Sequence, residues 1–165
     1  MKIYTKTGDR MTTSINKKRV YKDDEAINLV GTIDEVQTNL MVAYNFVDFE
    51  KIRIILLGIC EDLFTYSYDL ISENNTFPQT KVKDLEKIID EYSLKLPKLT
   101  EFIVPGKSRP SSLIHNARAV TRRCERLVVA YAKNHSVKPL LLQYINRLSD
   151  LLFILARAID EKIII

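Results

Sequence analysis

The chain has 165 residues, of which 46% are hydrophobic and 28% charged, so it is long enough to bury one core, and we expect a single domain over residues 1–165. The most apolar stretch, residues 55–64, is interrupted by Glu61 and Asp62, so we expect no membrane-spanning helix. The net charge of +4 permits an anionic partner but does not indicate nucleic acid, because charges of both signs are interspersed along the chain.

Residues 1–24 read MKIYTKTGDRMTTSINKKRVYKDD and have no helical periodicity. Their hydroxyl groups, backbone N–H groups and cations suit a flexible loop that wraps a polyphosphate. The segment lacks the P-loop pattern GxxxxGK(S/T), and its composition is equally that of a disordered N-terminus. Asp23 or Asp24 is placed to cap the first helix.

From residue 25 onward, apolar residues recur at alternating steps of three and four in five segments. These segments are residues 29–47, 52–70, 82–96, 113–131 and 141–159. Asparagine and proline residues mark the later connections between them. We therefore predict an all-α fold, a five-helix up-and-down bundle over residues 25–165. Just before the fourth helix lies an apolar loop, FIVPG (Phe102–Gly106), without an obvious structural role.

The cysteines and histidines identify no metal centre. Cys60 and Cys124 match no metal-ligand spacing and indicate buried thiols of a cytoplasmic protein. His115 and His135 have no partner at ligand spacing, and the Glu-x-x-His motifs of di-iron bundles are absent. The metal ligands of any site therefore stay unknown at this point.

Three of the predicted helices carry polar and apolar residues together on the face opposite the core. These residues are Asp34, Thr38 and Met41 on the first helix, Arg118, Arg122 and Glu125 on the fourth, and Asn146, Asp150, Phe153 and Arg157 on the fifth. Such faces are ordinarily exposed to solvent. The large apolar side chains of Met41 and Phe153 instead favour a second packing surface. If these faces meet another subunit, Asp34 and Arg118 are candidates for a salt bridge, and the bundle is an oligomer.

The fourth helix contains the stretch HNARAVTRRCER, with four arginines: Arg118, Arg122, Arg123 and Arg126. Because guanidinium offers a planar fork of donors to phosphate oxygens, phosphate is the predicted ligand. One alternative is a helical binding module that uses these arginines on an anionic polymer such as RNA, although few aromatic residues lie nearby for base stacking. Another alternative is a purely structural oligomeric bundle.

Six stretches follow one another along the chain: IYTKTGD with TTS, RVYKDD, VGTIDE, FIVPG, ARAVTRRCER and YINRLSDLLFILAR. In this order they resemble the successive motifs of the PduO-type ATP:cob(I)alamin (corrinoid) adenosyltransferases, over nearly the whole chain. The resemblance implies the ferritin-like five-helix bundle of these enzymes, assembled as a homotrimer with active sites between subunits. It also implies the reaction: the 5′-deoxyadenosyl group of ATP is transferred to the Co(I) of cob(I)alamin or a related corrinoid, which gives adenosylcobalamin and triphosphate.

The resemblance assigns roles by position, with an ATP-wrapping segment over residues 1–24. The matching residues of this segment are Thr5, Lys6, Thr7, Gly8, Thr13, Ser14 and Lys22. The matching nucleotide-site residues on the helices are Arg122, Arg123, Glu125, Arg126 and Asn146, with Arg122 as the triphosphate contact. Arg118 matches the arginine that pairs with Asp34 across the subunit interface. Phe102 matches the phenylalanine that closes the lower face of the corrin ring, excludes the axial base and makes Co(II) easier to reduce.

The implied catalytic set is therefore Asp34, Phe102, Arg118 and Arg122, with Mg²⁺ accompanying ATP. The implied partners are a reductase that supplies electrons and an adenosylcobalamin-dependent client enzyme, with no nucleic acid and no membrane. Met11 departs from the family pattern, because a glycine usually stands there and serves a backbone angle that methionine dislikes. Lys107 also stands where a second glycine is common.

Overall fold

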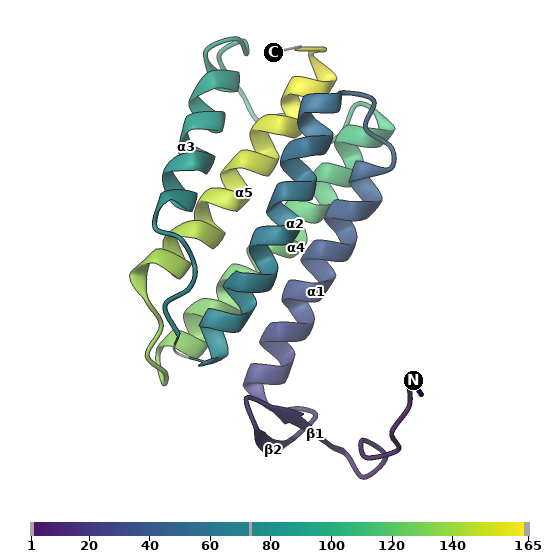
Figure 1. Ribbon diagram of the computed structural model, residues 1–165. Helices are drawn as coiled ribbons and strands as arrows, with labels where there is room; N and C mark the ends of the chain where they lie inside the picture. The colour runs from purple at the N-terminus through teal and green to yellow at the C-terminus, as the bar shows by residue number, and fades with distance from the viewer. Residues whose placement is uncertain (1, 73, 164–165) are drawn as a thin grey trace.

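Five helices and one short hairpin make up the computed structural model, which describes residues 2–72 and 74–163. The helices are α1 (Glu25–Tyr44), α2 (Glu50–Ser72), α3 (Thr80–Ser93), α4 (Arg109–Ala132) and α5 (Pro139–Asp160). Consecutive helices run in opposite directions, which confirms the predicted five-helix bundle (Figure 1). Residues 1, 73, 164 and 165 of the predicted ranges lie outside the described part.

The helix starts follow from local chemistry. Asp24 caps α1, because its side chain accepts a hydrogen bond of 2.9 Å from the backbone N–H of Ala26. Ser108 caps α4 and forms a capping box with Ser111, and Pro110 occupies the first turn, where its missing N–H costs nothing. The prediction of a cap at Asp23 or Asp24 is thereby confirmed at Asp24.

Two predicted segments run past the ends of their helices. α1 stops at Tyr44 and α3 at Ser93, whereas the apolar pattern extends to Val47 and Leu96. Both of these side chains are nevertheless buried. The apolar pattern therefore predicts the burial of both residues correctly. It does not predict the ends of the helices, because both residues enter the core after the helix has ended.

All five helices contribute to one core, and the most extensive contact is between α4 and α5. α1 covers the other side of α4, α2 packs on α1, and α3 packs on α5. Because α5 is enclosed by neighbours, it buries residues around most of its circumference. Cys60 and Cys124 are free and buried, and burial raises the pKa of their thiols to about 11 and about 12 respectively. They are the buried thiols expected from the sequence.

A hairpin at the start of the chain corrects the purely all-α prediction. β1 (Thr12–Ile15) pairs antiparallel with β2 (Lys18–Tyr21), and a two-residue turn joins them. Asn16 and Lys17 in this turn have φ of 46° and 62°, the left-handed angles of a type I′ turn. The sequence hid this hairpin because neither turn residue is glycine and each strand has only four residues. Residues 12–21 are thus an ordered hairpin and not a flexible loop.

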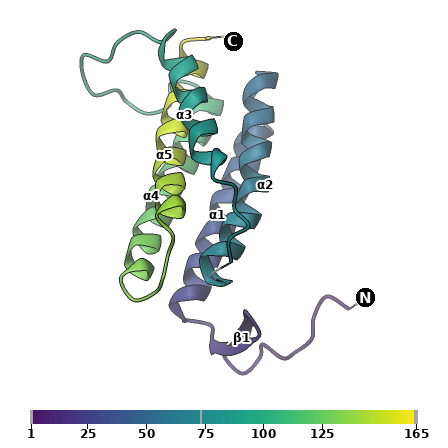
Figure 2. The same cartoon turned by 60° about the vertical axis from the view of Figure 1, so that its left-hand side comes forward.

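The hairpin lies at one end of the bundle and contacts the end of α2. The side-chain amide of Asn16 donates to the carbonyl of Ile71 at the end of α2, over 3.3 Å. Residues 2–11 extend from the hairpin away from the helices, whereas the loop between α3 and α4 stands out at the other end of the bundle (Figure 2). No helix in the described ranges combines the length and apolar character that crossing a bilayer requires.

A buried carboxylate holds the connection after α2 in place. Asp69 accepts hydrogen bonds from the backbone N–H groups of Thr76 and Phe77, each over 2.8 Å, and from the Thr76 hydroxyl over 2.5 Å. Burial alone would raise the pKa of Asp69, but these hydrogen bonds and the nearby Lys138 lower it below its ordinary value. Asp69 therefore stabilises the fold in its ionised form.

We predict that Asp69→Asn lowers the free energy of unfolding at pH 7 by about 1–3 kcal/mol, because an amide cannot accept all three hydrogen bonds in the same way. A group with a depressed pKa in the folded state stabilises it above its unfolded pKa, here about 4, and loses this effect as the pH falls further. The difference between the variant and the natural protein should therefore shrink below about pH 4. Urea denaturation at pH 7 and pH 3 measures it, with the exposed Asp84→Asn on α3 as the control. An equal difference at both pH values would contradict the prediction.

Candidate functional site

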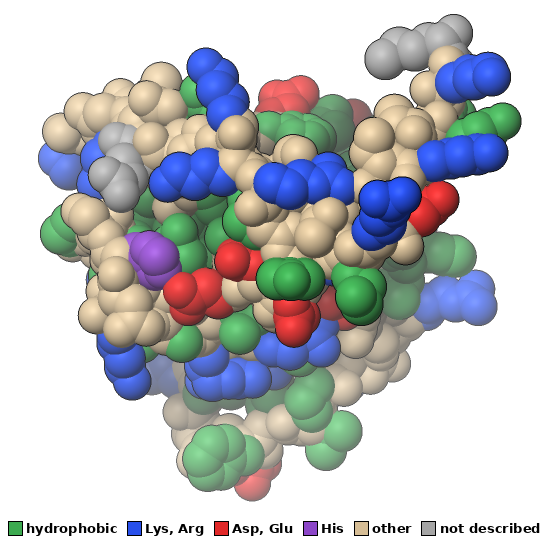
Figure 3. Space-filling model, turned by 90° about the horizontal axis from the view of Figure 1, so that it is seen from below, with side chains coloured by type: hydrophobic (Ala, Val, Ile, Leu, Met, Phe, Trp, Pro, Cys, Tyr) green, Lys and Arg blue, Asp and Glu red, His purple; other side chains and the backbone are tan. Residues whose placement is uncertain are grey.

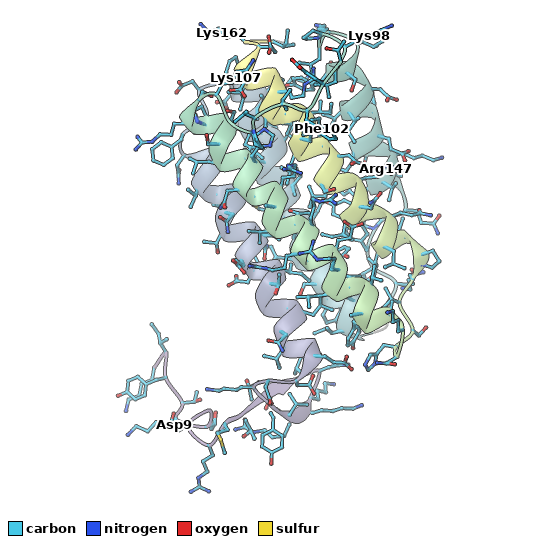
Figure 4. The ribbon with its side chains drawn as sticks, turned by 180° about the vertical axis from the view of Figure 1, so that it is seen from behind. Asp9, Lys98, Phe102, Lys107, Arg147 and Lys162 are labelled. Atoms are coloured by element: carbon cyan, nitrogen blue, oxygen red, sulfur yellow. The ribbon has the colours of Figure 1, made fainter. Side chains whose placement is uncertain are left out.

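The predicted site residues fall into two separate regions of the chain. One set lies in residues 5–22, on the hairpin and the segment before it, and the other lies on α4, α5 and the loop before α4, while Asp34 stands apart from both on α1. In Figure 4, Asp9 of the first region and Phe102 of the second lie towards opposite ends of the molecule. A single chain therefore does not bring the two sets together.

The first region is a basic segment organised by an arginine that the sequence interpretation missed. Arg19 donates from Nε to the hydroxyl of Thr12 over 3.0 Å, from Nη1 to Ser14 over 3.3 Å, and from Nη2 to the carbonyl of Thr7. Ser14 and Arg19 are partners in the hairpin and Thr12 lies on the same face, so these contacts can be recognised only once the strand pairing is known. Thr13 pairs with Val20 and belongs to the opposite face, so Thr13 and Ser14 do not point the same way.

The other predicted residues of this segment are exposed apart from the half-buried Gly8. The hydroxyls of Thr5 and Thr7 lie 2.8 Å apart. A side chain at Gly8 would begin 3.3 Å from Nζ of Lys22, so the glycine leaves room for this ammonium group to lie across the loop. Figure 3, which views the molecule from the hairpin end, shows several Lys and Arg side chains along this segment.

Met11 has a left-handed backbone, with φ of 60°, as does Lys6 with φ of 59°. The concern raised by the missing glycine is therefore justified, since such an angle costs a residue with a side chain about 1 kcal/mol. The loop adopts the turn nevertheless, and the Lys22 N–H donates to the Met11 carbonyl over 2.9 Å.

The second region contains a groove of about 670 Å³ between α3, α4 and α5. Its lining includes Arg118 and Arg122 from α4, Glu86 and Asp90 from α3, and Arg147, Asp150 and Phe153 from α5. Among the described residues, no carboxylate lies within ion-pair distance of Arg118 or Arg122. These two guanidinium groups are therefore the cations of the groove that remain available to bind an anion.

Arg118 is held against the bundle by its own helix and by α5. Its Nε donates to Nδ1 of His115 over 3.3 Å, and its guanidinium lies 5.9 Å from the ring centre of Phe153. Burial, and then the neighbouring Arg122, lower the pKa of Arg118. Burial and Arg118 likewise lower the pKa of His115, against the opposing effect of Asp160. His115 is therefore a buried neutral acceptor that orients Arg118.

The four arginines of the stretch HNARAVTRRCER do not form one cluster. Arg123 forms an ion pair with Glu35 of α1, on a different side of the helix from the groove, and Nη1 of Arg126 donates to the carbonyl of Arg122 over 3.0 Å. The reason is the rotation of about 100° per residue, which turns the adjacent Arg122 and Arg123 apart. Asp34, on the exposed side of α1, is among the carboxylates that do not pair with Arg118 in this chain.

Glu125 and Asn146 are brought together between α4 and α5. The side-chain amide of Asn146 donates to Oε1 of Glu125 over 2.8 Å. Both side chains are half-buried, so their remaining donors and acceptors are accessible from the surface. The sequence motifs had assigned both residues to one site, and their proximity agrees with that assignment.

The loop that carries Phe102 is tied to α5 at both ends. Arg157 donates to the carbonyl of Pro97 over 2.6 Å, and Asp160 accepts from the Lys107 N–H over 3.2 Å and from the Ser108 hydroxyl over 3.1 Å. Arg157 is therefore buried beneath the loop, and its predicted place on an outer face is wrong, because α3 and the loop enclose this end of α5. Between these anchors Phe102 is fully exposed.

A second groove, of about 800 Å³, lies beside this loop. Its lining includes Phe102, Ile103, Pro105, Arg118 and Phe153. Arg118 and Phe153 also line the first groove, so the apolar groove and the arginine groove are continuous. Within the described ranges, no three His, Cys, Asp or Glu side chains come together as a metal site. His135 instead pairs with Glu25 over 2.6 Å.

Gly106 fixes the path of the Phe102 loop onto α4. Its φ is 83°, and a Cβ atom there would lie 2.7 Å from the Cα of Ser112 and closer still to its hydroxyl. We predict that Gly106→Ala lowers the free energy of unfolding by about 1–3 kcal/mol and exposes the Lys107 amide to faster hydrogen exchange.

The matched control is Gly31→Ala in α1, where an added Cβ atom meets nothing within 4 Å and the change should be neutral or stabilising. Urea denaturation and amide exchange measure both variants. Identical behaviour of the two would refute the proposed role of Gly106.

Comparison with known proteins identifies the family. A sequence model described as cobalamin adenosyltransferase matches residues 3–159. A corrinoid adenosyltransferase of Bacillus subtilis (strain 168) is 39% identical over 170 residues, which cover 98% of this chain and 88% of that protein.

Two similar structures are variants of the PduO-type ATP:corrinoid adenosyltransferase from Lactobacillus reuteri. An arginine-to-lysine variant complexed with ATP gives a TM-score of 0.91 at 32% identity and covers 96% of this chain and 94% of its own. A phenylalanine-to-alanine variant complexed with cobalamin and ATP gives a TM-score of 0.91 at 32% identity and covers 97% and 94%. These matches confirm the prediction made from the sequence motifs, and the chain belongs to the cobalamin adenosyltransferase family.

Proposed function

We propose that the protein transfers the 5′-deoxyadenosyl group of ATP to the Co(I) of cob(I)alamin or a related corrinoid and releases triphosphate. The observation that carries this proposal is the continuity of the two grooves through Arg118 and Phe153. One groove offers unpaired guanidinium groups to an anion, and the other offers an apolar surface below the exposed Phe102. A reaction between a nucleotide and a large ring system requires two such neighbouring sites.

In this reaction the electron pair of Co(I) forms a bond to the 5′ carbon of ATP, and the bond from that carbon to its oxygen breaks. The electron pair of the broken bond leaves with triphosphate, so negative charge grows on the leaving group. Arg122 is placed to stabilise this charge, because it lines the groove and has no carboxylate partner among the described residues. No side chain of the protein needs to act as a covalent nucleophile.

Mg²⁺ enters this proposal together with ATP. Because the described residues bring no three acidic, His or Cys side chains together, phosphate oxygens and water supply most of its ligands. Glu125 and Asn146 then bind the nucleotide on the helices. The ATP-wrapping segment contributes Thr5, Lys6, Thr7, Gly8, Thr13, Ser14 and Lys22, and Arg123 and Arg126 are further candidate contacts.

Two known variants support the match of Phe102 and Arg122 to positions of the family. The phenylalanine and the arginine that were changed in the Lactobacillus reuteri enzyme are as far apart in that sequence as Phe102 and Arg122 are in this one. We assign Arg122 to the triphosphate and Phe102 to the lower face of the corrin ring. There Phe102 excludes the axial base and favours reduction of Co(II).

The complete site is proposed to form between subunits of a homotrimer. The N-terminal segment and the groove of one chain lie at separate places, so one copy must supply the segment to the groove of the next. Arg118 is half-buried and unpaired, and Asp34 is exposed on α1, so a pair between them across the interface would satisfy both charges. The residues 25–165 then form the bundle of one single-domain subunit.

The cellular setting follows from the chemistry of the substrate. Cob(I)alamin must be generated by reduction, so the proposal requires a reductase as a partner and a cytoplasmic, reducing location. Adenosylcobalamin is a cofactor for other enzymes, so an adenosylcobalamin-dependent client enzyme is the expected consumer of the product.

An RNA-binding module is a poorer account of the same arginines. Glu86, Asp90 and Asp150 line the groove opposite Arg118 and Arg122, and these carboxylates would repel a continuous phosphate backbone. The comparisons also offer no support for such a module.

The function is tested by an anaerobic assay in which chemically reduced cob(I)alamin is mixed with ATP and Mg²⁺ and the corrinoid spectrum is followed. We predict conversion to adenosylcobalamin by the natural sequence and a loss of about 100-fold or more in kcat/KM for Arg122→Met, because one charge-stabilising group is removed from the transition state.

The matched control is Arg109→Met at the start of the same helix, where the guanidinium lies over Phe46 and outside both grooves. This variant should keep nearly full activity. Absence of conversion by the natural sequence, or an equal loss of kcat/KM in both variants, would contradict the proposed function.

A further inference from the structure

One arginine of the groove differs from the others in its surroundings. Arg147 lies on α5 directly after Asn146, and unlike Arg118 and Arg122 it is surrounded by carboxylates. Its Nε donates to Oε1 of Glu86 on α3 over 2.9 Å, and its Nη1 lies 3.6 Å from Oδ2 of Asp150. The hydrogen bond with Glu86 is the main cause that raises the pKa of Arg147. Its charge is thus already balanced within the chain.

The same guanidinium also contacts the neighbouring side chain. Nη1 of Arg147 donates to Oδ1 of Asn146 over 3.0 Å, while Nδ2 of Asn146 donates to Oε1 of Glu125 over 2.8 Å. A guanidinium can only donate and a carboxylate can only accept, so these two partners allow just one orientation of the Asn146 amide. Rotating the amide by 180° would set donor against donor and acceptor against acceptor.

The contacts form one continuous chain from α3 to α4. It runs from Glu86 through Arg147 and Asn146 to Glu125, and donors and acceptors alternate at every step. Asn146 keeps one N–H and one lone pair outside this chain for a ligand. The last two members are nucleotide residues in the proposed function, on which this inference rests, whereas the first two have no assigned role.

We propose that Arg147 is a positioning residue that, anchored by Glu86, fixes the amide of Asn146 in the orientation that binds ATP. The opposing explanation is that Arg147 binds triphosphate directly, since it also lines the groove. The two explanations predict opposite changes in ATP affinity when the Glu86 carboxylate is removed. If Arg147 positions Asn146, losing its anchor weakens ATP binding. If Arg147 binds phosphate, losing a competing carboxylate strengthens ATP binding.

The chain supplies a matched control on the same helix. Glu91 of α3 pairs with Lys51 over 2.9 Å, and the two side chains are 40% and 43% exposed. Glu86 and Arg147 pair over the same distance with 43% and 40% exposed. Glu86→Ala and Glu91→Ala therefore remove equivalent surface ion pairs, and only the first belongs to the chain that reaches Asn146.

The experiment measures the Kd of Mg·ATP by calorimetry for the natural protein, for both alanine variants, for Arg147→Met and for the double variant E86A/R147M. We expect Glu86→Ala and Arg147→Met each to raise Kd by roughly three- to tenfold, and Glu91→Ala to leave it unchanged. In the Arg147→Met background, Glu86→Ala should have no further effect, because its influence passes through Arg147. Adenosyl transfer by the natural protein is measured beside the Kd series.

A lower Kd for Glu86→Ala, or equal values for Glu86→Ala and Glu91→Ala, would overturn the positioning role while leaving the proposed function intact. Tight ATP binding without adenosyl transfer by the natural protein would instead overturn the proposed function, and the Kd series would still decide the role of Arg147. Absence of ATP binding by the natural protein would overturn both.

Discussion

The packing of α4 on two sides is the constraint on which the site depends. α1 covers one side of this helix and α5 covers another, and the apolar residues that α4 buries are Ile114, Ala117, Val120, Cys124, Val128 and Tyr131. Polar residues of α4 are left with a limited arc of surface. Because each residue turns the helix by about 100°, this arc separates side chains that are adjacent in sequence. Arg122 consequently reaches the groove beside α5, whereas Arg123 turns to Glu35 on α1.

The same packing decides which charges are available. Carboxylates of the chain already balance Arg123 and Arg147, and Arg157 is buried against the Pro97 carbonyl. Arg118 and Arg122 are left without such partners in the first groove, and Arg118 also lines the second. A helix rich in arginine therefore presents a small, directed site for an anion, instead of a continuous basic surface.

Much of this arrangement could be predicted from the sequence. The spacing of apolar residues predicted all five helices, and a cap at Asp23 or Asp24 was predicted and is found at Asp24. The motif order identified the family. Periodicity could not find the hairpin, because its turn uses Asn16 and Lys17 without glycine. It also could not find Arg19 and Glu86, whose roles depend on contacts across strands or between helices that no local pattern encodes. The outer face assigned to Arg157 was wrong because helical angles alone do not say which neighbours enclose a helix.

The separation of the two regions within one chain has the largest functional consequence. The basic hairpin segment lies at one end of the bundle, whereas the groove lies along the middle of α3, α4 and α5 and the Phe102 loop lies towards the other end, so no rearrangement of a few side chains could join them. In the proposed homotrimer, assembly would bring these regions together, since a closed ring repeats one interface and each copy would give a segment and receive one. Catalysis would then be a property of the interface between copies.

Complementation between two inactive variants tests this claim most directly. Lys22→Glu changes only the N-terminal segment, which a subunit contributes to the site of its neighbour. Arg122→Met changes only the groove, which binds the segment of another subunit. The two chains are co-expressed with different tags, mixed assemblies are purified through both tags, and adenosyl transfer is measured. We predict that each variant alone is inactive and that the mixed trimers purified through both tags regain activity, with about one third of their interfaces carrying two natural partners. Inactive mixtures of two variants that assemble normally would contradict it.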